Sequence, residues 1–235
     1  MTIAVMQPYL FPYIGYWQLI NAVDKFVILD DVNYIMRGYI NRNRILINGQ
    51  PYMFTIPIKK ASQNKLIMDT EINFSDKEKD KFILTLQNAY KKTPYFEEVM
   101  PLIEEIIHNQ ASDLTKYIQF SIEKIMNYLN VQTSVLRSSE IEKNNSLKSE
   151  ERIIEICKKL DANIYINPCG GRLLYHHSKF EQEGMKLLFL DVKSDCITYS
   201  QMQKEFVSNL SIIDIMMFND VHTIQRFLKE YELNE

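Results

Sequence analysis

The chain has 235 residues, of which 46% are hydrophobic and 24% are charged, and this composition is typical of a globular protein rather than a disordered or fibrous one. Its net charge of -3 argues against general nucleic-acid binding, because a phosphate backbone needs a concentrated basic surface. The sequence contains no run of about 18 apolar residues, so we expect no transmembrane helix and no membrane insertion.

The beginning of the sequence and its cysteines indicate a cytoplasmic protein. The stretch MTIAVMQPYL lacks the basic segment and the small-residue cleavage site of a signal peptide. Cys157, Cys169 and Cys196 are an odd set without Cys-x-x-Cys spacing, which argues against a disulfide framework and a cysteine-based zinc site. A reducing cytoplasm fits this pattern best.

The sequence carries no firm signature for a metal or a dinucleotide. It has only six glycines, and neither a Gly-x-Gly-x-x-Gly run nor a P-loop motif occurs. His176 and His177 are adjacent and point different ways, and His108 and His222 supply no clear third metal ligand. The cofactor and the oligomeric state are therefore unknown from the sequence.

The N-terminal residues predict a β-α-β unit. Residues 3–6 form a short apolar strand, residues 7–13 a turn with two prolines, residues 15–23 a helix, and residues 26–29 a second buried strand. This succession predicts two parallel strands joined by a right-handed crossover.

A β-hairpin is predicted next. Residues 44–47 and 52–56 are its strands, and Asn48-Gly49 between them suits a type I′ turn because both residues tolerate positive φ. Residues 70–74 are a candidate for a further strand.

The middle of the chain is predicted to be helical. Ser75 is a candidate N-cap, and helices extend from there to about residue 129, with breaks near Pro94 and Pro101. We expect this region, at about 75–130, to be an insertion or lid in a single domain of residues 1–235.

The C-terminal part alternates strands and helices again, with an exposed loop at 140–147. The predicted strands are 133–136, 163–166 and 186–190, and the predicted helices are 149–160, 178–183, 211–218 and 221–231. The fold class is therefore α/β, with a mainly parallel Rossmann-like sheet, a β-hairpin and a helical insertion.

The turn after the first strand is the first candidate site. Ligands of open α/β sheets bind beyond the carboxyl ends of strands, and N–H groups at a helix start favour an anion. Gln7 and Tyr9 are predicted catalytic residues here. The predicted substrate-binding residues of this turn are Pro8, Tyr13, Gly15 and Tyr16. The alternative is that the aromatic residues simply cap the core.

The polar run after the second strand is the second candidate. Asp30 and Asp31 begin where that strand ends, so one carboxylate could act as a general base or hold an incoming amine. Mg²⁺ held by one carboxylate and phosphate oxygens is a further option. Tyr34 and Arg37 are predicted to contact the substrate. The alternative is that Asp31 caps a turn and Asp30 pairs with Arg37.

The run Asn41-Arg42-Asn43-Arg44 is the third candidate, since arginine binds phosphate through two parallel hydrogen bonds. Surface ion pairs are the alternative role of these arginines.

The fourth candidate follows the strand at 163–166. Gly170-Gly171 permits close backbone approach to a ligand, and Tyr175 lies nearby in the sequence. Cys169 could be a nucleophile with His176 or His177 as its base, although a structural role for this cysteine is favoured.

Several of these motifs resemble the WbqC-like protein family. They are MQPYLFPYIGYWQLI, DKFVILDDVNY and INRNRI, followed in order by SLKSEERIIEICKKL with Tyr165, the Gly170-Gly171 turn with Tyr175, and LSIIDIMMFN. Proteins of this family are associated with bacterial surface polysaccharide clusters, often beside genes for amino-sugar modification.

The resemblance implies a transferase of lipopolysaccharide O-antigen biosynthesis that moves an acyl or aminoacyl group to the amine of a nucleotide-linked amino sugar. An acyl carrier protein or another acyl donor would be its second partner. In this scheme Asp30 or Asp31 is the base, Arg42 or Arg44 clamps phosphate, and N–H groups near Tyr9, or Gln7, stabilise the oxyanion.

Two other functions stay open. The turn Phe11-Pro12-Tyr13-Ile14-Gly15-Tyr16 has a distant likeness to nucleotidylyltransferase-type folds, but tyrosines stand where that fold has two phosphate-holding histidines. An ATP-dependent ligase or nucleotidylyltransferase is therefore one alternative, and a non-catalytic scaffold is the other.

Overall fold

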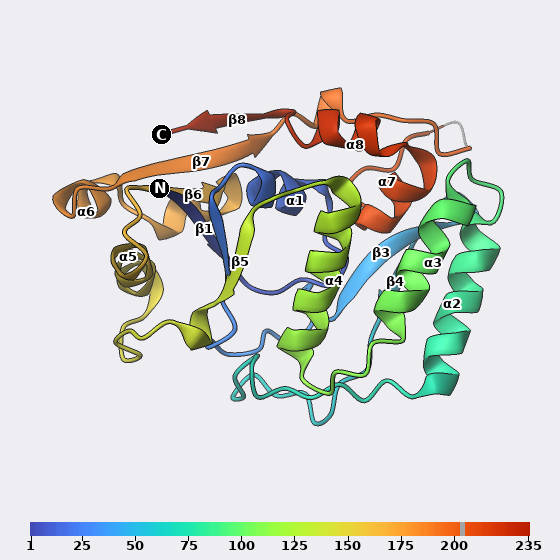
Figure 1. Cartoon of the computed structure of the whole chain (residues 1–235), viewed down its shortest axis with the longest axis horizontal. Helices are drawn as coiled ribbons and strands as arrows, with labels where there is room; N and C mark the ends of the chain where they lie inside the picture. The colour runs from blue at the N-terminus through green and yellow to red at the C-terminus, as the bar shows by residue number, and fades with distance from the viewer. Residues whose placement is uncertain (203–204) are drawn as a thin grey trace.

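A computed structural model describes residues 1–202 and 205–235. It contains a six-stranded sheet flanked by helices (Figure 1). The strands lie in the order β5-β2-β1-β6-β7-β8, and all neighbouring pairs are parallel except β7 and β8. Their bounds are β1 Thr2–Met6, β2 Lys25–Ile28, β5 Ser134–Arg137, β6 Ile164–Pro168, β7 Lys186–Val192 and β8 Tyr231–Asn234. The predicted α/β class with a mainly parallel sheet is confirmed.

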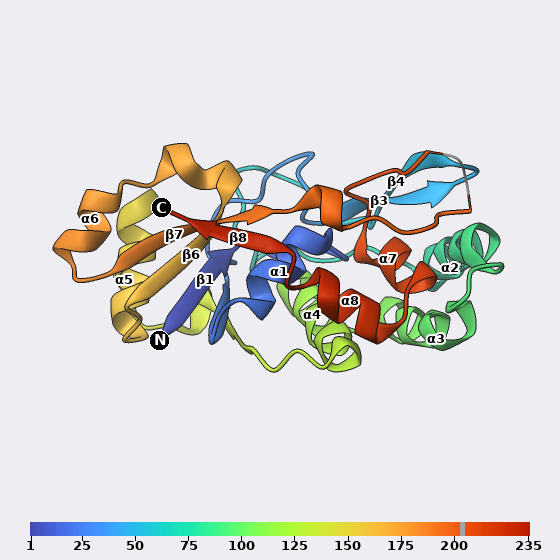
Figure 2. The ribbon, with the colours of Figure 1, turned by 90° about the horizontal axis from the view of Figure 1, so that it is seen from above.

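Helices cover both faces of the sheet. Successive side chains of a strand point to opposite faces, so one strand can contribute to both hydrophobic clusters. On β1, Ala4 packs in one hydrophobic cluster, whereas Ile3 and Val5 pack in the other. The first cluster contains α1, α4, α7 and α8, and the second contains α5 and α6 (Figures 1 and 2). These helices are α1 Ile14–Asn21, α4 Leu114–Leu129, α5 Ser149–Lys159, α6 His177–Gln182, α7 Ile212–Phe218 and α8 Val221–Phe227.

The predicted hairpin is confirmed as a separate two-stranded sheet of β3 (Arg42–Ile47) and β4 (Gln50–Thr55). Asn48 and Gly49 have φ values of 50° and 76°, which is the pair of positive values that a type I′ turn requires.

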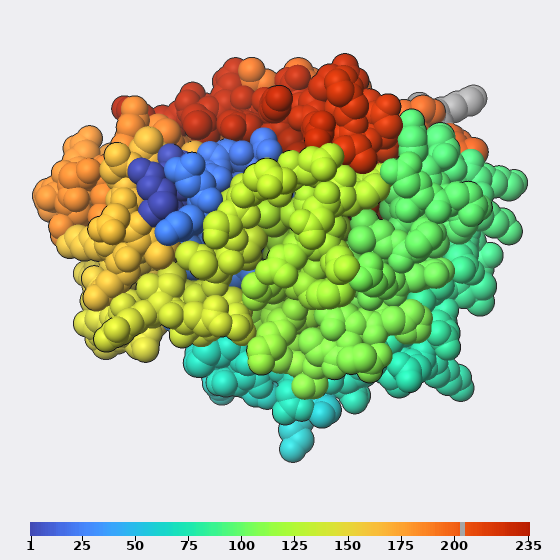
Figure 3. All heavy atoms as spheres, viewed as in Figure 1, coloured from blue at the N-terminus to red at the C-terminus, as the bar shows by residue number. Residues whose placement is uncertain are grey.

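The predicted helical region contains α2 (Asp76–Tyr90), α3 (Phe96–Ile107) and α4, which cover much of the face seen in Figure 3. Ser75 begins α2 through a capping box with Glu78, as the sequence indicates. The predicted break near Pro101 is wrong, since α3 continues through this residue. Buried neighbours such as Met100 and Ile103 hold the helix in place there, and tertiary packing outweighs the one hydrogen bond that proline removes.

Two other predictions near the edges of the fold are wrong. Residues 70–74 make only isolated bridges, such as Ile58 with Ile72, because no strand runs alongside them. The helix predicted at 221–231 ends at Phe227, and the chain returns as β8 antiparallel to β7. Residues 231–234 form a strand because the edge of β7 offers them hydrogen-bonding partners. A local sequence pattern carries no information about this distant edge.

None of the helices in the described ranges combines the length and the apolar character that crossing a bilayer would require.

Candidate functional site

The boundary between β1 and β6 is the topological switch point of the sheet. From β1 the chain crosses to β2 on one side, and from β6 it crosses to β7 on the other. Ligands of open α/β sheets bind in the crevice at this position, beyond the carboxyl ends of the strands. Gln7 follows β1 here, and Cys169 follows β6.

The turn between β1 and α1 is held by buried hydrogen bonds. Phe11 has a φ of 45°, which is uncommon for a bulky residue. Asn43 on β3 donates its side-chain amide to the oxygens of Leu10 and Phe11, at 3.2 and 2.7 Å. The Trp17 indole donates to the oxygen of Pro12 at 3.0 Å. Contacts from β3 and α1 therefore fix an otherwise unfavourable backbone shape.

Two of the predicted residues of this turn have distinct structural roles. Tyr16 is buried, and its hydroxyl donates to the main-chain oxygen of Gln7 at 3.0 Å. A β-carbon on Gly15 would lie 2.6 Å from the ring of Tyr13. Glycine is therefore what allows the Tyr13 ring to fold back against the start of α1.

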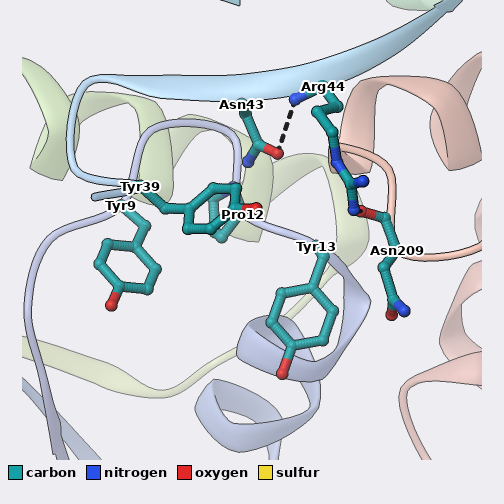
Figure 4. A pocket seen from close by; sticks show the side chains of 7 residues that line it. All are labelled: Tyr9, Pro12, Tyr13, Tyr39, Asn43, Arg44 and Asn209. Carbon is teal, nitrogen blue, oxygen red and sulfur yellow. Dashed lines mark hydrogen bonds between the residues drawn. The ribbon is translucent and has the colours of Figure 1, made fainter. Parts of the chain in front are cut away.

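A cavity of about 310 Å³ opens beside this turn (Figure 4). We call it the tyrosine pocket, and its lining residues are Tyr9, Pro12, Tyr13, Tyr39, Asn43, Arg44 and Asn209. The rings of Tyr9 and Tyr39 lie 6.5 Å apart between centroids, and Figure 4 shows the rings of Tyr9 and Tyr13 on the same side of the pocket. The pocket thus combines flat apolar surfaces with hydroxyl and amide groups.

Arg44 is the charged group of the tyrosine pocket. Its Nη2 donates to the main-chain oxygen of Asn209 at 3.2 Å, and its buried Nε has no hydrogen-bond partner in residues 1–202 and 205–235. The arginine ion pairs of these ranges belong to Arg137, Arg152 and Arg172 instead. A guanidinium without a carboxylate partner can bind an anionic group through its remaining donors.

Tyr9 and Tyr13 are neutral hydrogen-bonding groups of the pocket. Burial raises the pKa of Tyr9, and burial together with the nearby Cys169 and Tyr9 raises the pKa of Tyr13. Both hydroxyls therefore keep their protons near neutral pH and can donate hydrogen bonds to a ligand.

Asp30 is directed away from the tyrosine pocket. It has no exposed surface, and its carboxylate accepts hydrogen bonds from the N–H and hydroxyl of Ser139, at 2.9 and 2.7 Å. Ser139 belongs to the short 3-10 helix η1 (Ser138–Glu140), which follows β5. Burial raises the pKa of Asp30, and the two bonds from Ser139 oppose this shift. The carboxylate therefore connects the ends of β2 and β5.

Asp31 lies beside a second cavity, and its carboxylate is nearly buried. It pairs with Lys143 at 2.6 Å and with Arg152 at 3.4 Å. Lys143 lies in the loop predicted to be exposed, yet its side chain is only 1% exposed, so that prediction is wrong at this residue. The cavity has a volume of about 380 Å³, and its lining residues are Asp31, Val32, Asn33, Leu66, Asn145, Lys148, Ser149 and Arg152.

Because the ends of the first two strands are expected to lie side by side, the sequence predicts that Gln7, Tyr9, Asp30 and Arg42 face one shared cavity, and the structure does not meet this expectation. Tyr9 lines the tyrosine pocket, whereas Asp30 is enclosed with Ser139. The alternative partners proposed from sequence are also wrong, because Asp30 binds Ser139 rather than Arg37. The catalytic roles of Gln7, Tyr9, Asp30 and Asp31 stay predictions.

The other polar residues of these runs mainly organise the loop before β3. The Tyr34 hydroxyl donates to Asn41 at 2.6 Å, and the Asn41 amide donates to the oxygen of Ile56 at 2.7 Å. Arg42 donates its Nε to the oxygen of Gly38 at 2.8 Å. Arg37 is exposed, with a φ of 61°.

The run after β6 forms the short 3-10 helix η2 (Cys169–Leu174) at the same edge of the sheet (Figure 2). A β-carbon on Gly171 would lie 1.9 Å from the amide nitrogen of Asn167, so this glycine permits a close internal contact. Gly170 is exposed with open space around it. Tyr175 packs on the ring of Tyr165, with 5.7 Å between centroids, rather than in the tyrosine pocket.

Cys169 is exposed, and its thiol is hydrogen-bonded to Asp191 rather than to either predicted histidine. Partial burial and the Asp191 carboxylate raise the pKa of the Cys169 thiol. His176 pairs with Glu150 at 3.4 Å, and the ring of His177 packs on Phe189. These contacts do not favour an activated thiolate.

Sequence reasoning missed Tyr39 and Asn209 as pocket residues. Tyr39 lies two residues before Asn41, where the polar run begins, and this position was an available signal. Asn209 has no comparable local signal, since only the contact with β3 brings it to the pocket. In the ranges that the structure describes, no three His, Cys, Asp or Glu side chains gather into a group suited to a metal ion.

Comparison with known proteins agrees with these motifs. The model of the WbqC-like protein family matches residues 7–226. The chain is 26% identical over 216 residues to the uncharacterized protein Rv1507c of Mycobacterium tuberculosis, covering 91% of this chain and 92% of that protein. No solved structure matches. The family match includes the turn that forms the tyrosine pocket, and the chain belongs to the WbqC-like protein family.

Proposed function

We propose that this protein is a cytoplasmic transferase of bacterial surface polysaccharide biosynthesis, including O-antigen, which acylates the amine of a nucleotide-linked amino sugar. The transferred group is an acyl or aminoacyl group, and the donor is an acyl carrier protein or another activated acyl compound. Membership of the WbqC-like family supports the polysaccharide context, and the tyrosine pocket supports the class of acceptor.

The observation that carries this proposal is the Arg44 guanidinium, which lies among three tyrosines and has no carboxylate partner in residues 1–202 and 205–235. A nucleotide-linked sugar consists of flat rings joined by a diphosphate. The Arg44 guanidinium suits the diphosphate, because charge-assisted hydrogen bonds from arginine to phosphate are strong and directional. The rings of Tyr9, Tyr13 and Tyr39 suit the faces of the base or the sugar, which stack on aromatic side chains.

The proposed reaction also needs acid–base chemistry. An acyl transfer to an amine needs a group that accepts the amine proton and donors that stabilise the oxyanion. Asp30 or Asp31 is proposed as the base, and N–H groups near Tyr9, or the Gln7 side chain, as the donors. Asp30 is bonded to Ser139, and Asp31 is paired with Lys143. Substitution of each aspartate therefore decides which of them is the base.

Binding measurements test the acceptor site. Calorimetry should show that the purified protein binds a nucleotide-linked 4-amino sugar, and Arg44→Gln should weaken binding at least about tenfold, because a hydrogen bond to a charged group contributes about 1.5–3 kcal/mol. Arg226→Gln is the matched control, since Arg226 is an exposed arginine on α8. Equal affinity of the wild-type protein and the Arg44 variant would remove the proposed site.

Product analysis tests the reaction. The protein is incubated with the amino sugar and a panel of acyl thioesters, and mass spectrometry should detect the N-acylated sugar. If no donor gives product and Asp30→Ala and Asp31→Ala keep full function in cells, the transferase proposal is wrong. Tight ATP binding with pyrophosphate release would instead favour an ATP-dependent ligase or nucleotidylyltransferase. Full function of all pocket variants would favour a scaffold.

A further inference from the structure

A buried carboxylate lies behind the tyrosine pocket. Asp214, on α7, has no exposed surface, and it accepts hydrogen bonds from the Tyr90 hydroxyl at 2.9 Å, the Tyr199 hydroxyl at 2.7 Å and the Gln201 amide at 2.9 Å. Burying a carboxylate away from water is costly unless donors replace the water. Three donors from two segments, α2 and residues 199–201, meet this need here, and the proposed transfer reaction does not use the group.

The first donor connects Asp214 to the strand that carries Arg44. The Tyr90 hydroxyl, which donates to Asp214, also accepts a hydrogen bond from the main-chain N–H of Leu46 at 3.0 Å. Leu46 lies on β3, two residues after Arg44. A shift of the Asp214 side chain would therefore remove the support of β3 next to the pocket.

The third donor connects Asp214 to the segment that carries Asn209. The Gln201 amide donates to the oxygen of Val207 at 3.0 Å, and Val207 donates its N–H to the side-chain oxygen of Gln201 at 2.7 Å. Val207 lies two residues before Asn209, whose main-chain oxygen accepts the bond from Arg44. Asp214 thus orients Gln201, and Gln201 fixes the path of the chain toward the pocket.

The start of α7 also touches both walls of the tyrosine pocket. Ser211 donates its N–H to the main-chain oxygen of Arg44 at 2.8 Å, and Ile212 donates to the oxygen of Pro12 at 3.0 Å. Residues 205–211 are therefore joined to β3 on one side of the pocket and, through α7, to the turn after β1 on the other.

We propose that Asp214 is a positioning residue of the tyrosine pocket: it fixes residues 205–211 against β3 and so holds the Arg44 guanidinium ready for an anionic ligand. This inference rests on the proposed function only in taking the ligand to be anionic. Asp214 does not touch the ligand, and it acts through Asn209 and Arg44.

Hydrogen exchange of the ligand-free protein tests whether Asp214 fixes residues 205–211 against β3. Asp214→Asn should raise the exchange rates of the Val207 and Ser211 amides about tenfold, because the lost charge weakens hydrogen bonds that fix this segment. Amides of β1 and β6 should not change. Tyr199→Phe removes one donor to Asp214 without altering the carboxylate. It should raise the same two exchange rates by a smaller factor, and it replaces Asp214→Asn in the test if that variant folds poorly. Tyr128→Phe is the matched control, since it removes an exposed tyrosine–carboxylate bond to Glu98 elsewhere.

A double-mutant cycle with inorganic pyrophosphate as the probe tests the link to Arg44. Asp214→Asn should raise the Kd for pyrophosphate about fivefold to tenfold in the wild-type background. Arg44→Lys keeps a positive charge but lacks the guanidinium that bonds to Asn209. In that background the effect of Asp214→Asn should largely disappear, because the two residues act through one contact. If Asp214 had only a general structural role, Asp214→Asn would weaken pyrophosphate binding equally in both backgrounds.

Two results would overturn the inference: unchanged exchange at Val207 and Ser211 in Asp214→Asn and Tyr199→Phe, or additive effects in the cycle. If the wild-type protein does not bind pyrophosphate, the anion site of the proposed function fails instead. The exchange of the Ser211 amide, which is bonded to Arg44, then still decides whether Asp214 holds this segment on β3.

Discussion

The ring of Tyr13 occupies the space that a side chain on Gly15 would need. A β-carbon at Gly15 would lie 2.6 Å from this ring, closer than real carbon contacts allow. Because Tyr13 lines the tyrosine pocket, the glycine two residues further along the chain influences the shape of the pocket.

Gly15→Ala should therefore weaken ligand binding without unfolding the protein. The displaced Tyr13 ring loses its stacking surface, which is worth about 1 kcal/mol, or roughly a fivefold rise in Kd. Calorimetry with the nucleotide-linked amino sugar measures this change. Gly170→Ala is the matched control, since a β-carbon there meets nothing within 4 Å. Equal affinities of the two variants would show that the Tyr13 position does not matter.

Asp30→Asn should be tolerated at neutral pH. The asparagine can still accept from the Ser139 N–H, and its amide can donate to the Ser139 hydroxyl, so both bonds survive without a buried charge. Denaturant unfolding at pH 7 should show a change within about 1 kcal/mol. Full transfer activity of this variant would assign Asp30 a structural role, whereas a folded but inactive variant would support its role as the base.

The pH dependence of the same variant has a definite sign. The pKa of Asp30 is raised in the folded protein by burial, so the folded state binds this proton more tightly than the unfolded state does. The wild-type protein therefore gains stability relative to Asp30→Asn as pH falls through the raised pKa toward the ordinary value of 3.8. Unfolding curves of both proteins from pH 7 down to about the ordinary pKa measure this gain, which approaches about 1.4 kcal/mol for each pH unit that separates the folded-state pKa from the unfolded-state pKa. A growing advantage of the asparagine variant at low pH would contradict the assignment.

Lys143→Met should destabilise the protein strongly, because it leaves the nearly buried Asp31 carboxylate with Arg152 as its remaining cation at 3.4 Å. Removing one partner of a buried ion pair costs about 3 kcal/mol. The midpoint of urea unfolding measures the loss. Lys59→Met, which removes an exposed pair with Glu71, should leave the midpoint unchanged. Equal midpoints of the two variants would show that the Lys143 pair does not support the fold.

The cysteines should react with iodoacetamide according to exposure and pKa. Burial raises the pKa of Cys157 to about 12, so this thiol should stay unmodified in the folded protein. Cys169 is exposed but has a raised pKa, so its alkylation should be slow near neutral pH and speed up as the pH rises. Mass spectrometry of timed samples measures both sites. Rapid alkylation of Cys169 at pH 6.5, combined with loss of activity in Cys169→Ser, would revive its role as a nucleophile.

The sequence by itself determined the elements whose signals are local. Alternating apolar strands and amphipathic helices predicted the α/β class, because residues that must be buried recur with the period of their element. Asn48-Gly49 predicted the hairpin turn, since its backbone requires positive φ. The run after the first strand predicted residues of one cavity, since Tyr9 and Tyr13 line the tyrosine pocket.

The tertiary structure alone decided which polar residues line a cavity. Arg44 meets Asn209 across 165 positions of the chain, and Asp30 meets Ser139 across 109. Such contacts depend on how distant segments pack, so no local pattern encodes them. They place Asp30 and Asp31 away from the tyrosines, and among residues 1–202 and 205–235 no carboxylate pairs with Arg44 beside the tyrosines. The fold class follows from local patterns along the chain. The candidate site follows from the burial of side chains and from contacts between residues that are far apart in the sequence.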